Sequence, residues 1–167
     1  MRRKQVTVIG RYDATDDQYE QGVAMGKMLA EMDIIAITGG RAGLMEAVAK
    51  GCSEAGGISI GLLPGEKFHD SNPYNTIVIP TGIGYARNSM NVLAADVVIA
   101  IGGASGTLCE MAFAWSYKKP IIALTTSGGW AEKLAGEHID HRQDQPVHAA
   151  HSLADVKRLL EELLGED

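Results

Sequence analysis

The segment Asp96-Val-Val-Ile-Ala-Ile-Gly-Gly-Ala-Ser-Gly-Thr107 runs from an apolar stretch straight into a glycine-rich turn. Its nearly unbroken series of apolar residues is typical of a strand that is buried on both faces, as the strands of a parallel sheet are. A helical stretch follows the turn and continues to about Tyr117. The segment therefore predicts the strand, turn and helix of one unit in a parallel α/β sheet.

The same order of elements occurs on both sides of this segment. We expect strands at residues 5–10, 34–38, 58–63, 76–79, 96–101 and 120–124, with a short one near Val147. Helices are predicted between them. One begins at the capping box Thr15-Asp-Asp-Gln18, and the last begins at residues 152–155. The predicted fold class is α/β, a Rossmann-like three-layer sandwich with a mostly parallel, doubly wound sheet.

Length, composition and charge narrow the class of protein further. The chain has 167 residues, of which 46% are hydrophobic, so we expect a single domain over residues 1–167. Its formal net charge is −6 and it has no basic stripe, which argues against a nucleic-acid partner. The apolar stretch behind Arg2-Arg3-Lys4 is too short for a signal peptide or a membrane span. We therefore expect a cytoplasmic protein without membrane contact.

Cysteines and histidines do not follow the spacing of a metal site. Cys52 and Cys109 lie far apart, with no CxxC motif. His138, His141, His148 and His151 form a local cluster, but no two of them are four residues apart and Pro146 interrupts the stretch. We expect no metal site and no required cofactor.

Glycine is the residue that points to function. It accounts for 20 of 167 residues, against roughly 7% in average proteins, and it gathers in pairs and triples. Two groups, 39–43 and 102–107, each lie between a predicted strand and a predicted helix. In an open parallel sheet this position holds anionic ligands, because helix N-termini present free N–H groups there. The alternative is that glycine only permits a tight turn, but two such turns in one small domain favour a shared anion site.

An ordinary NAD-binding domain has a different arrangement. It carries G-x-G-x-x-G after its first strand, whereas this chain has Gly10-Arg-Tyr-Asp13 there. We therefore do not expect a dehydrogenase.

Three motifs resemble the LOG-like superfamily, formerly described as possible lysine decarboxylases. They are TGGRAGLMEAVAKG at 38–51, GYARNSMN at 84–91 and IGGASGTLCE at 101–110. The cytokinin-activating phosphoribohydrolases of that superfamily carry GGGxxGLM, a helix with ERK, and PGGxGTxxE. The resemblance extends over nearly the whole chain and implies a LOG-like nucleotide-binding domain.

Where the chain departs from the enzyme patterns, its sequence resembles another branch of the superfamily, which contains the molybdenum-cofactor carrier proteins. Five residues depart from the enzyme patterns: Thr38, Gly102, Ala104, Ala86 and Asn88. Five residues match the carrier-type G-x-A-R-x-x-x-N stretch and the turn that follows it: Gly84, Ala86, Arg87, Asn91 and Thr107. This resemblance implies a ligand-binding set made of Thr38, Gly39, Gly40, Arg41, Gly43, Leu44, Met45, Asn91, Gly102, Gly103, Ala104, Ser105, Gly106 and Thr107.

Arg87 and Glu110 are the candidate catalytic residues that the resemblance implies. A guanidinium fits a phosphate or a carboxylate in two-pronged fashion, although Arg87 could equally form an ordinary surface ion pair. Glu110 ends the sequence Thr107-Leu-Cys-Glu110, which reads as a capping box. If hydrolysis is retained, Glu110 would stabilise the charge that develops as an N-glycosidic bond breaks. The enzymes' second carboxylate is absent.

Three hypotheses follow from these residues. The first is a homodimeric or homotetrameric carrier of a phosphate-bearing, nucleotide-like or pterin-like small molecule, with molybdenum cofactor as a bound ligand. The second is a nucleoside 5′-monophosphate phosphoribohydrolase that releases free base and ribose 5-phosphate. The third is a domain that only scaffolds other proteins, which predicts no stabilisation by a phosphate ligand.

Overall fold

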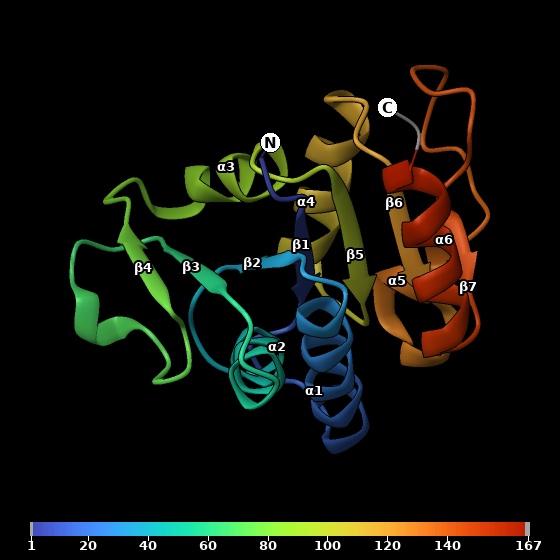
Figure 1. Cartoon of the computed structure of the whole chain (residues 1–167). Helices are drawn as coiled ribbons and strands as arrows, with labels where there is room; N and C mark the ends of the chain where they lie inside the picture. The colour runs from blue at the N-terminus through green and yellow to red at the C-terminus, as the bar shows by residue number, and fades with distance from the viewer. Residues whose placement is uncertain (1, 166–167) are drawn as a thin grey trace.

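The computed structural model describes residues 2–165, in which strands and helices alternate along the chain (Figure 1). The strands are β1 (Gln5–Gly10), β2 (Ile35–Thr38), β3 (Ser59–Leu63), β4 (Ile77–Pro80), β5 (Val97–Ile101), β6 (Ile121–Leu124) and β7 (His148–Ala150). The α-helices are α1 (Asp16–Glu31), α2 (Leu44–Glu54), α3 (Arg87–Leu93), α4 (Ser105–Ser116), α5 (Gly129–Leu134) and α6 (Leu153–Gly165). Three short 3₁₀ turns complete the described elements: Phe68–Asp70, Gly84–Ala86 and Thr125–Ser127.

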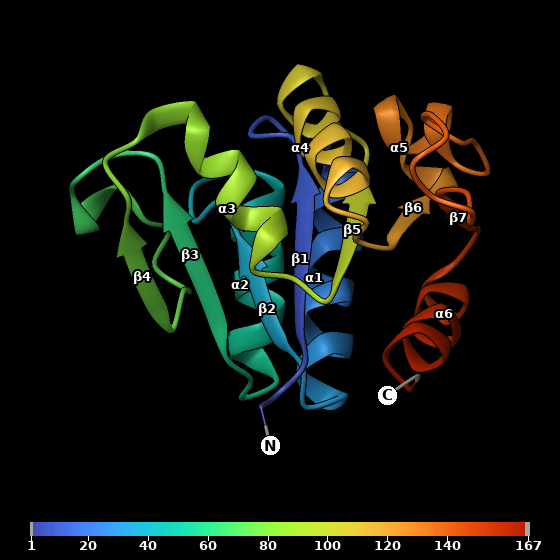
Figure 2. The same ribbon diagram turned by 90° about the horizontal axis from the view of Figure 1, so that it is seen from above.

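The strands form one sheet in the order β4-β3-β2-β1-β5-β6-β7, and every pairing is parallel. Figure 2 shows α3 and α4 on one side of this sheet and α1 and α2 on the other. Buried side chains of α6 join the layer of α1 and α2, and those of α5 join the layer of α3 and α4. The predicted Rossmann-like, doubly wound α/β class is confirmed.

Strand β5 shows why its sequence predicted this architecture. Val97, Ile99 and Ile101 point into the core on the α1 side, while Val98 and Ala100 point into the core on the α4 side. All five residues are at most 1% exposed. An unbroken apolar run is therefore needed, because consecutive residues of a strand face opposite sides of the sheet.

Helix α1 begins and packs as its sequence indicates. The Thr15 hydroxyl accepts from the Gln18 N–H, and the Gln18 side chain accepts from the Thr15 N–H. Gly22 and Gly26 face α2 so closely that a methyl group at Gly26 would collide with the Val48 carbonyl. The predicted capping box is confirmed, and the two glycines allow α1 to pack closely on α2.

The strand order places one pair of loops opposite each other. The chain moves outward from β1 to β4 on one side of the sheet and then returns to the centre, where β5 pairs with the other side of β1. The loops that leave the carboxyl ends of β1 and β5 consequently diverge to opposite faces and leave a crevice between them, which is where open α/β sheets bind ligands. No helix within residues 2–165 has the length and apolar character needed to cross a bilayer.

Candidate ligand-binding site

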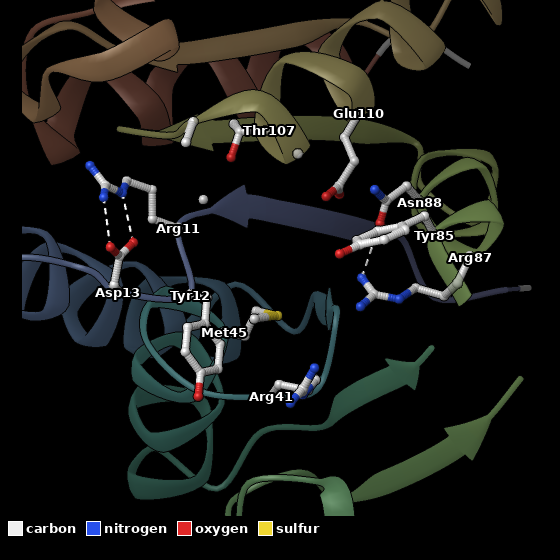
Figure 3. Close-up of a pocket in the computed structure, with 13 residues that line it drawn as sticks. Arg11, Tyr12, Asp13, Arg41, Met45, Tyr85, Arg87, Asn88, Thr107 and Glu110 are labelled. Atoms are coloured by element: carbon white, nitrogen blue, oxygen red, sulfur yellow. Dashed lines mark hydrogen bonds and ion pairs between the residues drawn. The ribbon is translucent and has the colours of Figure 1, made fainter. Parts of the chain in front are cut away.

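A cavity of about 510 Å³ opens at the carboxyl ends of β1 and β5 (Figure 3). This is within the roughly 300–1,000 Å³ usual for small-molecule sites. Residues from four parts of the chain line it: the loop after β1, the turn before α2, the start of α3 and the first turns of α4. They are Gly10, Arg11, Tyr12, Asp13, Arg41, Met45, Tyr85, Arg87, Asn88, Ala104, Gly106, Thr107 and Glu110.

The start of α4 presents free backbone donors to this cavity. Helix α4 begins at Ser105. Its first backbone hydrogen bond runs from the Leu108 N–H to the carbonyl of Ala104, the residue just before the helix. Within the described chain no hydrogen bond uses the N–H groups of Ser105, Gly106 and Thr107. Nothing lies within 4 Å of the place where a side chain at Gly106 would begin. The positive end of the helix dipole therefore faces open space, as an anion site requires.

The glycines just before α4 have a different task. The Gly102 N–H donates to the Ser127 hydroxyl at 2.7 Å, so it is already used inside the protein. Gly102 and Gly103 have φ values of +61° and +108°, a region that residues with side chains rarely adopt. The Thr107 side chain packs directly over Gly103. These glycines shape the turn, while the helix start behind them supplies the donors.

The first glycine turn, before α2, contributes side chains to the cavity, whereas the start of α4 contributes backbone N–H groups. The Gly40 N–H donates to the Thr38 hydroxyl at 3.1 Å, and the Leu44 N–H donates to the Arg11 carbonyl at 3.0 Å. From this turn it is Arg41 and Met45 that reach the cavity. The two turns thus meet at one crevice, as expected, but they are not equivalent.

The loop at 66–75 supports this first turn. In the structure the Asn72 side-chain amide donates to the Gly40 and Arg41 carbonyls at 3.2 and 2.9 Å, and the Asn75 amide also donates to Gly40. No residue of the loop lines the cavity. The loop therefore holds the position of Arg41 from behind.

Arg87 is buried at the cavity wall. It is 8% exposed, and its Nη1 donates to the Asn88 side-chain oxygen at 3.3 Å, whereas its Nε has no partner. No ion pair within 4.0 Å joins it to Glu110. Burial lowers the pKa of Arg87 from its usual range, and the Arg41 charge acts in the same direction, while the Glu110 charge opposes them. The alternative of an ordinary surface ion pair is wrong, because the guanidinium is neither exposed nor paired with an acid.

Glu110 lies on the same cavity one helical turn further along α4. It is 8% exposed, and burial raises its pKa to about 7, against the opposing effects of the Arg87 charge and a hydrogen bond from Asn91. The predicted capping box with Thr107 is wrong. Helix α4 starts three residues earlier than this box requires, with Ala104 as an N-cap that makes no side-chain bond, so the Glu110 carboxyl is left to face the cavity.

The predicted ligand-binding residues divide into two groups. Those that line the cavity are Arg41, Met45, Ala104, Gly106 and Thr107, together with the predicted catalytic pair Arg87 and Glu110. Those that do not are Thr38, Gly39, Gly40, Gly43, Leu44, Asn91, Gly102, Gly103 and Ser105. Asn91 is 1% exposed, and its side-chain oxygen has no partner.

Sequence reasoning missed the loop after β1 and, next to the predicted Arg87, the lining residues Tyr85 and Asn88. Arg11 and Asp13 form a two-pronged ion pair, with Nε to Oδ1 at 2.8 Å and Nη2 to Oδ2 at 2.7 Å (Figure 3). The Tyr12 ring lies 5.6 Å from the Arg41 guanidinium carbon, a distance suited to a cation–π contact. The position of this loop directly after the first strand was the available signal, since the crevice of such folds opens there.

Metal-binding groups do not gather in the described part of the chain. No three His, Cys, Asp or Glu side chains of residues 2–165 are arranged to hold a metal ion. His138 contacts the Asp144 carbonyl at 3.1 Å and His151 the Thr125 hydroxyl at 2.8 Å, so these two histidines have separate neighbours.

Comparison with known proteins agrees with the fold and with the family resemblance. Residues 3–157 match the SLOG cluster4 family. An uncharacterized protein of Archaeoglobus fulgidus is 36% identical over 124 residues, which are 74% of this chain and 82% of that protein. The structure of a molybdenum cofactor binding protein from Rippkaea orientalis is similar with a TM-score of 0.88 and 33% identity, covering 98% of this chain and 99% of that one. The molybdenum cofactor carrier protein of Chlamydomonas reinhardtii has a TM-score of 0.87 and 33% identity, covering 99% and 100%.

These matches confirm the LOG-like resemblance and its carrier-type departures. They extend over nearly the full chain. Each of the three motifs that carry the resemblance contributes residues to the cavity. The chain belongs to the SLOG cluster4 family.

Proposed function

We propose that this cavity binds a phosphate-bearing, nucleotide-like or pterin-like small molecule and that the protein acts as its carrier. One observation supports this above all: the free N–H groups at the start of α4 and the buried Arg87, whose Nε has no partner, belong to the same cavity. Each is a donor without an acceptor. An anionic ligand in this cavity would accept from the free N–H groups and would be attracted by the positive charge of Arg87.

The energetics favour an anion at this place. A buried guanidinium is costly unless it is paired and hydrogen-bonded. Arg11 is neutralised by Asp13 at the cavity rim, but Arg41 and Arg87 have no acidic partner within ion-pair distance. Glu110 is the one other acid that lines the cavity, and its pKa of about 7 leaves it largely uncharged at mildly acidic pH. The cavity therefore has positive charge in excess, which suits a phosphate.

The carrier role rests on the relatives. The Rippkaea orientalis protein is a molybdenum cofactor binding protein and the Chlamydomonas reinhardtii protein is a molybdenum cofactor carrier. Gly84, Ala86, Arg87, Asn91 and Thr107 follow the carrier-type pattern in this chain. We therefore propose molybdenum cofactor as a candidate cargo, with its phosphate at the start of α4 and its pterin ring toward the cavity mouth.

A second candidate is a nucleoside 5′-monophosphate phosphoribohydrolase, and one observation favours it. Arg87 and Glu110 line the same cavity, and the pKa of Glu110, about 7, is suited to proton transfer near neutral pH. In this reaction the Glu110 carboxylate takes a proton from the attacking water. The water oxygen bonds to C1′ of the ribose as the N-glycosidic bond breaks, and the departing base takes up a proton. Free base and ribose 5-phosphate result.

One incubation distinguishes the two candidates. Purified protein is mixed with AMP or with an N6-substituted AMP, and free base is followed by chromatography. Sustained release that Glu110→Gln abolishes would establish the hydrolase and contradict a pure carrier. If the protein is a carrier, we expect no release of free base and a rise in Tm on ligand addition that Arg87→Ala removes. Arg158→Ala is the control, since Arg158 pairs with Glu162 on the exposed side of α6. Absence of stabilisation by any phosphate ligand would leave the scaffold hypothesis.

A further inference from the structure

Tyr85 stands out at the mouth of the cavity. Its side chain is 91% exposed, yet it lines the same cavity as Arg87 and Glu110. In Figure 3 its ring lies on the side of the cavity formed by the start of α3, across from Arg11 and Asp13. An exposed aromatic face at the mouth of a cavity is a surface on which a planar ring can stack. The ring is therefore available to a ligand.

The backbone under Tyr85 is held firmly. The N–H groups of Thr81, Gly82 and Gly84 donate to the carbonyls of Leu63, Gly65 and Pro64 at 3.0, 3.0 and 2.9 Å. The Thr81 hydroxyl adds a bond to the Leu63 carbonyl at 2.7 Å. These bonds anchor the segment to the carboxyl end of β3. The exposure of Tyr85 thus comes from its fixed position and not from a frayed loop.

We propose that Tyr85 stacks on the planar ring of the ligand and so selects ring-bearing phosphates over simple sugar phosphates. This inference rests on the proposed function, because it assumes that the phosphate lies at the start of α4. Thr107 and Glu110 are three residues apart in that helix, so they are offset by about 4.5 Å along its axis. A nucleotide that begins at the helix start passes Glu110 with its sugar and brings its ring to the cavity mouth.

The residues near the mouth suit this arrangement. Tyr85 offers an aromatic face, and its hydroxyl makes no hydrogen bond to any described residue. Arg87 and Asn88, the other cavity residues at the start of α3, hold each other through a hydrogen bond. Stacking depends on the π-face and tolerates different bases. A purine and a pterin would therefore both be accepted.

The test compares two classes of ligand with four proteins. The ring-bearing ligands are a carbocyclic AMP analogue, which has no N-glycosidic bond to hydrolyse, and neopterin monophosphate; ribose 5-phosphate lacks a ring. The proteins are wild type, Tyr85→Ala, Tyr85→Phe and the control Phe68→Ala, whose side chain is 70% exposed but does not line the cavity. Affinities are measured by isothermal titration calorimetry.

We expect Tyr85→Ala to weaken binding of at least one ring-bearing phosphate about tenfold and to leave ribose 5-phosphate binding unchanged. Tyr85→Phe and Phe68→Ala should bind like wild type. Equal loss for all ligands, an unchanged affinity in Tyr85→Ala, or a Tyr85→Phe variant as weak as Tyr85→Ala would overturn the stacking role. So would a wild type that binds ribose 5-phosphate at least as tightly as both ring-bearing ligands. If wild type binds none of the three, it is the proposed phosphate site itself that fails.

Discussion

Arg87 occupies the space beside Gly39 in which a side chain at residue 39 would have to lie. A methyl group added to Gly39 would collide with Nη1 of Arg87 and with the sulfur of Met45, which it would meet at 2.6 Å. Gly39 is not among the glycines with positive φ, so the reason for glycine here is space for the guanidinium and not backbone freedom. The first glycine turn and the helix that carries Arg87 are therefore in direct contact at this position.

The first prediction uses this contact. Gly39→Ala should displace the Arg87 side chain and reduce ligand-induced stabilisation as strongly as Arg87→Ala does, although residue 39 does not line the cavity. The atoms in the way are the far ends of two flexible side chains, which can shift, so the cost in stability should be small. The measurement is the shift of Tm on adding AMP, with Gly165→Ala, where a methyl group meets open space, as the control. A full ligand response in Gly39→Ala would show that the contact does not position Arg87.

The second prediction concerns the cost of burying Arg87. Its charge is 8% exposed and its Nε lacks a partner, and replacing a poorly compensated buried charge by an apolar side chain of similar length often stabilises a protein. Arg87→Met should raise the free energy of unfolding of the ligand-free protein by about 1–2 kcal/mol and abolish the response to phosphate ligands. Urea unfolding with and without ligand measures both. A destabilised ligand-free variant would mean that Arg87 is already well compensated inside the protein.

Much of the fold could be predicted from the sequence because its determinants are local. The alternation of buried faces in β5 requires an apolar run, and the Thr15–Gln18 cap is contained within four residues. The chemistry at the start of α4 was harder to predict. Thr107 and Glu110 have capping-box spacing, but the turn of Gly102 and Gly103 lets the helix begin at Ser105 without a side-chain cap. The N–H groups left free in this way are the ones that we assign to the ligand.

Other parts of the site depend on strand order, which no local pattern reveals. The loop at 11–13 becomes part of the cavity only because β1 pairs with β5 on the side away from β2. Tyr85 is likewise brought to the mouth by hydrogen bonds between residues 81–84 and the end of β3. The loop at 11–13 carries no motif of its own. Tyr85 lies in the motif at 84–91, but the motif alone does not reveal that its side chain reaches the cavity.

The third prediction addresses assembly. The family resemblance implies a homodimer or homotetramer, and α3 leaves Met90 and Leu93 exposed by 40% and 50%. Three positions apart, they lie on the same side of the helix. A double substitution, Met90→Glu with Leu93→Glu, should convert an oligomer to a monomer in light scattering coupled to size exclusion, while paired glutamates at the exposed Lys157 and Arg158 of α6 should not. If the wild-type chain is monomeric at all concentrations tested, the expected homo-oligomer is contradicted.

The last prediction follows from the buried carboxyl of Glu110. Its pKa is raised to about 7 in the folded protein from an ordinary value of 4.5. Between these two pH values the folded state holds a proton that the unfolded state has released. The free energy of unfolding therefore falls as pH rises from 4.5 to 7, and above pH 7 this loss stays constant. The full effect is about 3 kcal/mol. Glu110→Gln removes it, so the stability of this variant relative to wild type should increase by that order between pH 4.5 and pH 8, as urea unfolding at each pH would measure. A difference between the two proteins that stays constant with pH would mean that Glu110 titrates near its ordinary value, and it would remove the basis for proton transfer by this residue at neutral pH.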